Sequence, residues 1–147
     1  MKARIWLTGF KPFGEHASNP SQQLVEPILN TTRTHRLQPT SIHALESDSV
    51  EMTFSGMILP VNEAGSCLSL EHLETVDAVV HVGLHENAEN VRFEMCAINV
   101  FDFRIPDNSG RQISGDFIDE SGDALLHTTI NSPSISNAFS ENDAIII

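Results

Sequence analysis

The chain has 147 residues, 40% of them hydrophobic, which is the composition of a globular protein rather than a disordered one. Its formal net charge is -12, from 8 Lys and Arg against 20 Asp and Glu. This balance argues against a nucleic-acid backbone or an anionic membrane as partner, because both need clustered positive charge. No apolar run is long enough for a secretion signal or a membrane span. The two cysteines, Cys67 and Cys96, form neither a disulfide framework nor a zinc pattern, so a reduced, cytoplasmic compartment is expected.

The first part of the chain is predicted to form a strand, an aromatic loop and a helix. Residues 4–9 (RIWLTG) read as a short apolar strand that opens into FKPFG at 10–14, a loop carrying two phenylalanines. Asn19 is a candidate N-cap, with Pro20 at the first helical position. The apolar face of this helix is expected to consist of Leu24, Val25, Ile28 and Leu29. This order is the opening half of a β-α-β motif.

The middle of the chain is predicted to continue with strands and a helix. The expected elements are, in order, a polar surface connection over 30–40, a short strand over 42–45, a strand over 53–60, a helix within 62–74 and a strand over 77–83. The last of these is continuous in β-branched residues, which is typical of a central parallel strand covered on both faces. Cys67 falls on the apolar face of the helix, and we interpret it as a core residue.

The stretch 91–108 (VRFEMCAINVFDFRIPDN) places polar side chains at close intervals among apolar ones. Its imperfect alternation favours a strand within 91–103 over a helix. Residues 105–110 then read as an extended segment entering a turn, because a proline holds Ile105 extended and Asp, Asn and Gly supply turn chemistry. A polar strand end running into such a loop is where α/β enzymes tend to place working groups. The alternative is an edge strand with solvated polar residues.

The remainder of the sequence carries weaker signals. Residues 110–122 are a glycine-rich, acidic loop, 124–130 a short helix or a turn, and 131–142 a weakly helical segment at best. The run Ala144-Ile145-Ile146-Ile147 is an apolar strand signal, with a strand expected to start near 143. We interpret it as part of a domain cut short, and the alternative is a terminal strand docking at a sheet edge. The overall prediction is an α/β fold with a largely parallel central sheet.

Several motifs together resemble the pyroglutamyl peptidase I (pyrrolidone-carboxylate peptidase) family. They are TGFKPFG at 8–14, NPS at 19–21, LPV at 59–61, VGL at 82–84, Glu94 followed by AIN at 97–99, and RIPDNSG with Gln112 at 104–112. The resemblance covers residues 4–118 and, more loosely, the rest. It implies a single three-layer α/β/α domain over 1–147 with a mixed, largely parallel sheet, whose C-terminal part is missing here.

The family is a cysteine peptidase that removes an N-terminal pyroglutamate from peptides without metal or cofactor, and its members are often tetrameric. The resemblance therefore implies pyroglutamyl peptides as partners and allows a homo-oligomer. By motif, the family's catalytic glutamate falls on Glu94 and its oxyanion-side arginine on Arg104. The two phenylalanines that hold the lactam ring fall on Phe10 and Phe13, and a substrate-contacting asparagine on Asn19.

The family's cysteine and histidine motifs lie later and are absent from this sequence. A thiol nucleophile needs a base and a group that orients the base, so Glu94 alone cannot catalyse hydrolysis. We interpret Cys96 as structural, although it lies two residues from Glu94, and a zinc site at His81 and His85 is disfavoured because they span a strand end and a loop. Two hypotheses remain: an incomplete peptidase that is inactive alone, or a non-catalytic relative, either a binding protein or a decayed homologue.

Overall fold

The computed structural model describes residues 1–36, 49–85, 87–130 and 144–146. The short strand expected at 42–45 and the weak helix expected at 131–142 lie outside the described residues. The chain divides into two compact units: unit 1 comprises residues 1–84 with 107–111, and unit 2 comprises 85–106 with 112–147. No helix in the described part of the chain is long and apolar enough to cross a membrane.

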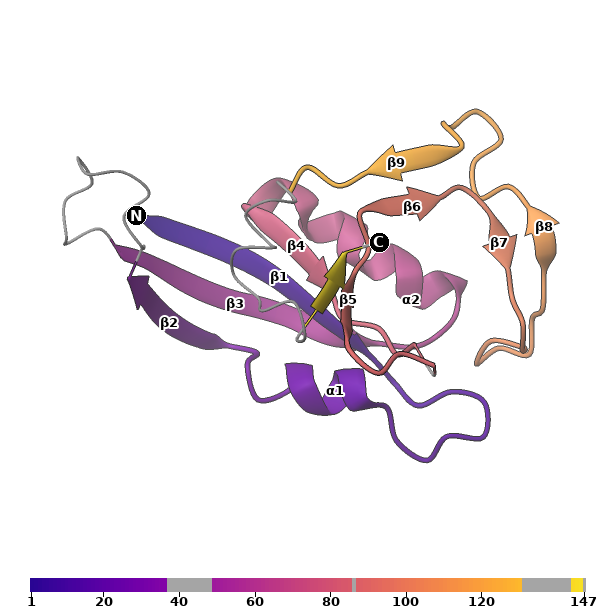
Figure 1. Ribbon diagram of the computed structural model, residues 1–147, viewed down its shortest axis with the longest axis horizontal. Coiled ribbons are helices and arrows are strands. Elements are labelled where there is room, and N and C mark those ends of the chain that lie inside the picture. Colours follow the sequence, from indigo (N-terminus) through magenta and orange to yellow (C-terminus); the bar gives the residue numbers. More distant parts are fainter. Residues whose placement is uncertain (37–48, 86, 131–143, 147) are drawn as a thin grey trace. The chain divides into compact units, whose positions relative to one another are not determined.

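Unit 1 is built on a four-stranded sheet with the strand order β2-β3-β1-β4. The strands are β1 (Lys2–Phe10), β2 (Thr31–Arg36), β3 (Ser49–Leu59) and β4 (Ala78–His81). Strand β1 pairs in parallel with both β3 and β4, whereas β2 pairs antiparallel with β3 (Figure 1). The predicted α/β fold with a mixed, mostly parallel sheet is confirmed, as are the strands expected at 4–9, 53–60 and 77–83.

The helices of unit 1 pack on both faces of this sheet. They are α1 (Pro20–Val25), α2 (Glu63–Cys67) and the 3-10 helix η1 (Leu68–Thr75). On one face, the indole of Trp6 donates to Ser69 Oγ at 3.2 Å and stacks on His72 with 3.7 Å between ring centroids. Gly9 projects to the other face, because side chains alternate along a strand. A Cβ at Gly9 would lie 2.7 Å from the Ser21 carbonyl oxygen of α1.

The core of unit 1 lies along the two central strands. The buried apolar side chains among the described residues are Trp6, Leu7, Val25 and Leu59. Strands β1 and β3 approach closely at Gly56, whose φ is +153° and where a Cβ would lie 1.7 Å from the Leu7 carbonyl oxygen. Only glycine fits such a backbone approach without displacing the strand pair.

Two predicted features of the strands are wrong. Residues 31–36 are not a loop but strand β2, which lies at the sheet edge, where polar side chains can face solvent. Strand β4 is not central: it is the other edge of the described four-stranded sheet, and Val80 is 40% exposed. Its β-branched residues specify a strand, but a strand's own composition does not specify its neighbours.

Two predictions about the helices are also wrong. Helix α1 ends at Val25, so residues 28 and 29 lie beyond it, and Leu24 is exposed rather than on the buried face. Pro27 explains this end, because proline lacks an N–H and disfavours helical continuation at the residue before it. Cys67, expected in the core, is exposed at the end of α2.

The described residues of unit 2 form three two-stranded pairs. Its strands are β5 (Val91–Phe93), β6 (Cys96–Ile98), β7 (Phe101–Asp102), β8 (Ser114–Asp116), β9 (Leu125–His127) and β10 (Ala144–Ile146). Strand β10 pairs in parallel with β5, and the pairs β6–β9 and β7–β8 are antiparallel. The strands expected within 91–103 and near 143 are confirmed, whereas β9 replaces the helix or turn expected at 124–130. None of residues 85, 87–106 and 112–130 is buried.

Candidate ligand-binding site

The aromatic loop, residues 10–14, follows directly from the carboxyl end of β1. Phe10 and Phe13 are both half-buried. The Phe10 backbone N–H donates to Ser21 Oγ at 3.0 Å, and the Phe13 ring packs edge-on against His16 with 5.9 Å between centroids. Gly14 ends the loop with φ +60°, a conformation that glycine adopts readily. The loop therefore presents two partly accessible aromatic rings from a fixed backbone.

Asn19 ties this loop to helix α1. Its side-chain Oδ1 accepts from the backbone N–H of Ser21 at 3.0 Å and from Ser21 Oγ at 2.9 Å, which confirms the predicted N-cap. Its Nδ2 donates to the Lys11 carbonyl at 3.2 Å, and the residue is only 2% exposed. One side chain thus serves the start of the helix and the backbone of the aromatic loop together.

The turn over residues 107–111 contacts the same end of the sheet. The Asn108 backbone N–H donates to the Val61 carbonyl at 2.8 Å, and its Nδ2 donates to the Pro12 carbonyl at 3.2 Å. Lys11 N–H donates in turn to the Leu59 carbonyl at 2.8 Å. The motifs at 8–14 and 59–61 and residues 107–110 of the last motif therefore meet at the carboxyl ends of β1 and β3. Sequence reasoning identified each motif but not the contact that Asn108 makes.

Strand β4 adds a titratable side chain near this end of the sheet. His81 Nδ1 and Thr8 Oγ1 lie 2.6 Å apart, and Thr8 is fully buried. Burial lowers the pKa of His81 below its ordinary value, because a partly covered imidazole is less well solvated when charged. In the neutral ring, Nδ1 can accept a hydrogen bond from the Thr8 hydroxyl.

The two predicted catalytic residues belong to unit 2. Glu94 is exposed in the short loop between β5 and β6. Arg104 is exposed shortly after β7, and its carbonyl accepts from Gln112 Nε2 at 3.1 Å. The structure thus brings Phe10, Phe13 and Asn19 together within unit 1. Convergence of all five predicted residues on one cleft stays a prediction.

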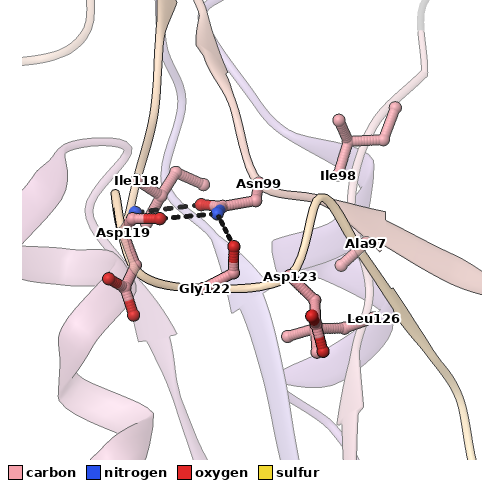
Figure 2. Close-up of a pocket in the computed structure, with 8 residues that line it drawn as sticks. All are labelled: Ala97, Ile98, Asn99, Ile118, Asp119, Gly122, Asp123 and Leu126. Atoms are coloured by element: carbon pink, nitrogen blue, oxygen red, sulfur yellow. Dashed lines mark hydrogen bonds between the residues drawn. The ribbon is translucent and has the colours of Figure 1, made fainter.

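Unit 2 contains an apolar cavity of about 320 Å³ beside the β6–β9 pair (Figure 2). Its lining residues are Ala97, Ile98, Asn99, Ile118, Asp119, Gly122, Asp123 and Leu126. Asn99 holds the loop that borders it: Nδ2 donates to the carbonyls of Asp119 at 2.7 Å and Gly122 at 3.3 Å, and Oδ1 accepts from the Asp119 N–H at 2.9 Å. The asparagine of the AIN motif therefore shapes a loop in this structure.

The remaining reactive side chains do not assemble into a recognisable centre. Cys67 and Cys96 are both exposed. Within residues 1–36, 49–85 and 87–130, no three His, Cys, Asp or Glu side chains are grouped so that they could hold a metal ion. What the described residues do present is a pair of half-buried aromatic rings, Phe10 and Phe13, at the strand ends of an α/β sheet.

Comparison with known sequences identifies the group to which this α/β protein belongs. The family model described as pyroglutamyl peptidase matches residues 3–143. The chain therefore belongs to the pyroglutamyl peptidase family, as the motifs predict.

Curated relatives show the same relationship over part of their length. The pyrrolidone-carboxylate peptidase of Coprothermobacter proteolyticus is 34% identical over 144 residues, which cover 95% of this chain and 61% of the relative. That of Thermococcus litoralis is 25% identical over 142 residues, covering 95% of this chain and 57% of the relative. The chain thus spans between 57% and 61% of the length of these two relatives.

Solved structures of similar proteins share the fold. The pyrrolidone carboxyl peptidase from Thermococcus litoralis matches with a TM-score of 0.75 and 27% identity, covering 99% of this chain and 61% of that one. A mutant pyrrolidone carboxyl peptidase from Pyrococcus furiosus matches with a TM-score of 0.76 and 24% identity, covering 98% and 64%. The second likeness supports the fold alone.

Proposed function

We propose that the aromatic loop of unit 1 binds the pyroglutamyl group at the N-terminus of a peptide. The observation that carries this proposal is the anchoring of the loop at three points, by Ser21, Asn19 and Asn108, with Phe10 and Phe13 left half-buried. A pyroglutamyl ring is a flat, neutral lactam, which two aromatic side chains can hold by stacking and apolar burial. Family membership and the names of the relatives support this substrate class.

We propose further that the 147-residue chain alone does not hydrolyse its ligand. The family-type cysteine and histidine motifs are absent from the sequence, and Glu94 would only orient a base. Members of a catalytic triad act as a unit, so loss of the nucleophile removes several orders of magnitude of rate. Arg104, on the oxyanion side by resemblance, would stabilise developing negative charge only once a nucleophile is supplied. An incomplete peptidase and a non-catalytic relative would both bind the pyroglutamyl group, whichever of the two this chain is.

Ligand binding tests the first proposal directly. We expect L-pyroglutamamide to shift the NMR resonances of the Phe10 and Phe13 rings, and L-prolinamide to bind much more weakly, because it carries a charged amine in place of the lactam. Phe13→Ala should weaken pyroglutamamide binding, whereas Phe117→Ala, at an exposed phenylalanine of unit 2, should not. Equal binding of both amides, or an equal loss in the two variants, would refute pyroglutamyl recognition.

Turnover of a pyroglutamyl-amide fluorogenic reporter tests the second proposal. The 147-residue chain should give no thiol-inhibitable turnover. A chimera that continues with the corresponding C-terminal part of the Thermococcus kodakarensis relative, which is 31% identical over 140 residues, should cleave the reporter. It should lose that activity when the cysteine of the added part is changed to Ser. Turnover by the 147-residue chain that disappears in Cys96→Ser or Cys67→Ser would contradict the proposal.

A further inference from the structure

Backbone hydrogen bonds and the carboxylate of Asp107 stabilise the turn over residues 107–111. The Asp107 N–H donates to the Arg111 carbonyl at 2.8 Å, and the Gly110 N–H donates to the Asp107 carbonyl at 2.9 Å. Asp107 Oδ1 accepts from the backbone N–H of Ser109 at 2.8 Å and of Arg111 at 2.9 Å. Gly110 has φ +78°. Because the side chain of Asp107 is only 5% exposed, this turn is organised around a buried negative charge.

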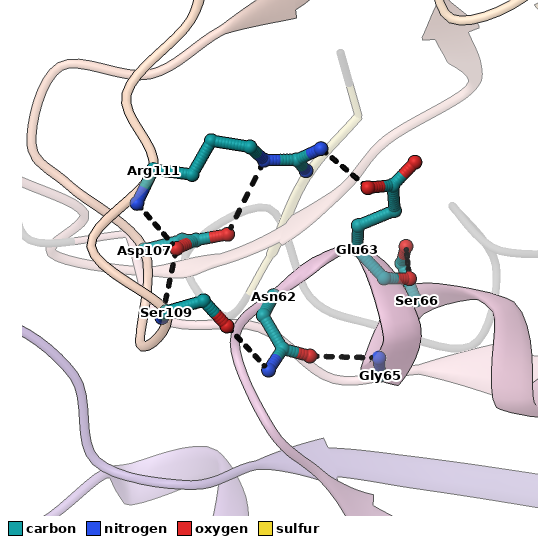
Figure 3. Close-up of polar contacts among 7 residues, drawn as sticks. All are labelled: Asn62, Glu63, Gly65, Ser66, Asp107, Ser109 and Arg111. Atoms are coloured by element: carbon teal, nitrogen blue, oxygen red, sulfur yellow. Dashed lines mark hydrogen bonds and ion pairs between the residues drawn. The ribbon is translucent and has the colours of Figure 1, made fainter.

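Arg111 joins the turn to the start of helix α2 (Figure 3). Its Nη1 pairs with Glu63 Oε2, and its Nε lies 3.6 Å from Asp107 Oδ2. Asp107 Oδ2 accepts no hydrogen bond from the described residues, and the Arg111 guanidinium is the cation that pairs with it. Burying a carboxylate without a cation nearby is costly, so Arg111 stabilises the turn as well as linking it to α2.

A hydrogen bond also joins the turn to α2, in addition to this ion pair. Asn62 caps α2, with its Oδ1 accepting from the Gly65 N–H at 2.8 Å. Its Nδ2 donates to Ser109 Oγ at 3.1 Å. The turn is therefore fixed to the beginning of α2 by one ion pair and one neutral hydrogen bond.

The same turn reaches the aromatic loop through Asn108. The Asn108 backbone is fixed to Val61, and its side chain holds the carbonyl of Pro12. Pro12 lies between Phe10 and Phe13, so a shift of the turn would be transmitted to the backbone between the two rings. Glu63, Arg111, Asp107, Asn108 and Pro12 thus form one continuous chain of contacts.

We propose that Arg111 is a positioning residue for the aromatic loop. It holds the 107–111 turn between Glu63 and Asp107, and the turn in turn holds Pro12 through Asn108. The inference rests on the proposed pyroglutamyl-binding function, since it assigns Arg111 a role in setting the separation of the two rings that would bind the lactam. Arg111 itself does not contact the ligand in this scheme.

The test combines amide hydrogen exchange in the ligand-free protein with pyroglutamamide affinity. Arg111→Met should accelerate exchange of the Lys11 and Asn108 amides and weaken affinity about fivefold, the factor expected when one positioning hydrogen bond is lost. Arg111→Lys should restore part of the amide protection and part of the affinity, because lysine keeps the charge but not the planar guanidinium group. Arg33→Met, at an exposed arginine of edge strand β2, is the matched control and should change neither.

Asn108→Asp isolates the final contact, because it removes the donor to Pro12 without touching the ion pairs. It should reproduce the affinity loss of Arg111→Met. Glu63→Gln, which removes the exposed charge that pairs with Arg111, decides the question if Arg111→Met does not fold. Wild-type Lys11 exchange and affinity in Arg111→Met, or in Glu63→Gln where only that variant folds, would overturn the inference. If the wild-type protein does not bind pyroglutamamide, the proposed function fails, and Lys11 exchange alone then decides the role of Arg111.

Discussion

Thr8 and His81 form a polar contact at the end of the sheet that carries the aromatic loop. The 2.6 Å separation of Oγ1 and Nδ1 gives the fully buried Thr8 hydroxyl a partner, and an unsatisfied buried hydroxyl would be destabilising. Protonation of His81 would convert Nδ1 from an acceptor to a donor and place a charge in a partly covered position. The folded state therefore favours the neutral ring, which agrees with the lowered pKa of His81.

This contact predicts a pH dependence of stability. Because the folded-state pKa of His81 lies below the unfolded value, the unfolded chain binds the proton more readily. The contribution of His81 to stability should be complete above about pH 6.5 and should decline as the pH falls below that value, until the folded ring also titrates. Thermal midpoints measured between about pH 7.5 and pH 5 should show this decline.

His81→Asn is the informative variant for that measurement, because its amide oxygen can accept from Thr8 but does not titrate. It should flatten the midpoint profile relative to the wild type. His35→Gln, at an exposed position on β2, should leave the profile unchanged. A profile that keeps its full slope in His81→Asn would assign the pH dependence to another group.

Helix α1 is short, and its position depends on its two ends rather than on an extended apolar face. Asn19 caps it and Pro20 opens it, whereas Pro27 limits it after Val25. Val25 and Ser21 are buried and Leu24 is 64% exposed, so only a narrow stripe of the helix faces the core. An isolated helix of six residues would not be stable in water, so the cap and the contact with β1 carry its stability.

Asn19 variants can separate the cap from the contact with the aromatic loop. Asn19→Ala removes both and should lower the free energy of unfolding by about 1 to 2 kcal/mol. Asn19→Ser keeps a neutral N-cap acceptor for Ser21 but loses the amide that donates to the Lys11 carbonyl, so it should recover most of the helix stability. Denaturant titration measures the stability, and exchange of the Lys11 amide measures the loop. Equal stability losses in the two variants would show that the loop contact, and not the cap, is what matters.

Local sequence signals predict where helices and strands lie better than they predict which elements these pack against or pair with. The NPS motif correctly marked the start of α1, and the apolar runs marked β1, β3 and β4. The end of α1 is also encoded locally, by Pro27, a signal that the apolar spacing of residues 28 and 29 does not take into account. Strand β2 is polar because it lies at an edge, and that placement depends on pairing with β3, which the sequence of β2 does not reveal.

The candidate site was predictable only in part, for the same reason. The family motifs identified Phe10, Phe13 and Asn19, which the structure places together. The contact between Asn108 and Pro12 joins residues 96 positions apart, and no local pattern encodes such a pairing. The role of Arg111 likewise depends on Glu63, 48 positions earlier. Glu94 and Arg104 stay predictions from resemblance.

The two units differ in the kind of structure that holds them together. Unit 1 has a four-stranded sheet with helices packed on it and buried side chains at its centre. In the described part of unit 2, the strands form separate pairs, and large apolar side chains such as Ile98, Phe117 and Leu126 are more than half exposed. Isolated strand pairs are marginal in water, because they bury too little apolar surface to offset chain entropy.

Hydrogen exchange measured along the whole chain should reveal this difference. Amides that pair β6 with β9, and the Asn99 amide that donates to Ala124, should exchange much faster than the amides between β1 and β3. Equal protection in the two units would show that they unfold as a single cooperative body, contrary to this expectation.

The return of the chain to unit 1 at residue 107 has a consequence during synthesis. The strands β1, β3 and β4 leave the ribosome well before the turn that fixes Pro12, because residues 85–106 are made in between. At elongation rates of 5 to 20 residues per second, the 96 residues from Pro12 to Asn108 take about 5 to 20 s. For that interval Ser21 and Asn19 can already hold the aromatic loop and only the Asn108 contact to Pro12 is missing, so the loop reaches its final conformation after the sheet that carries it.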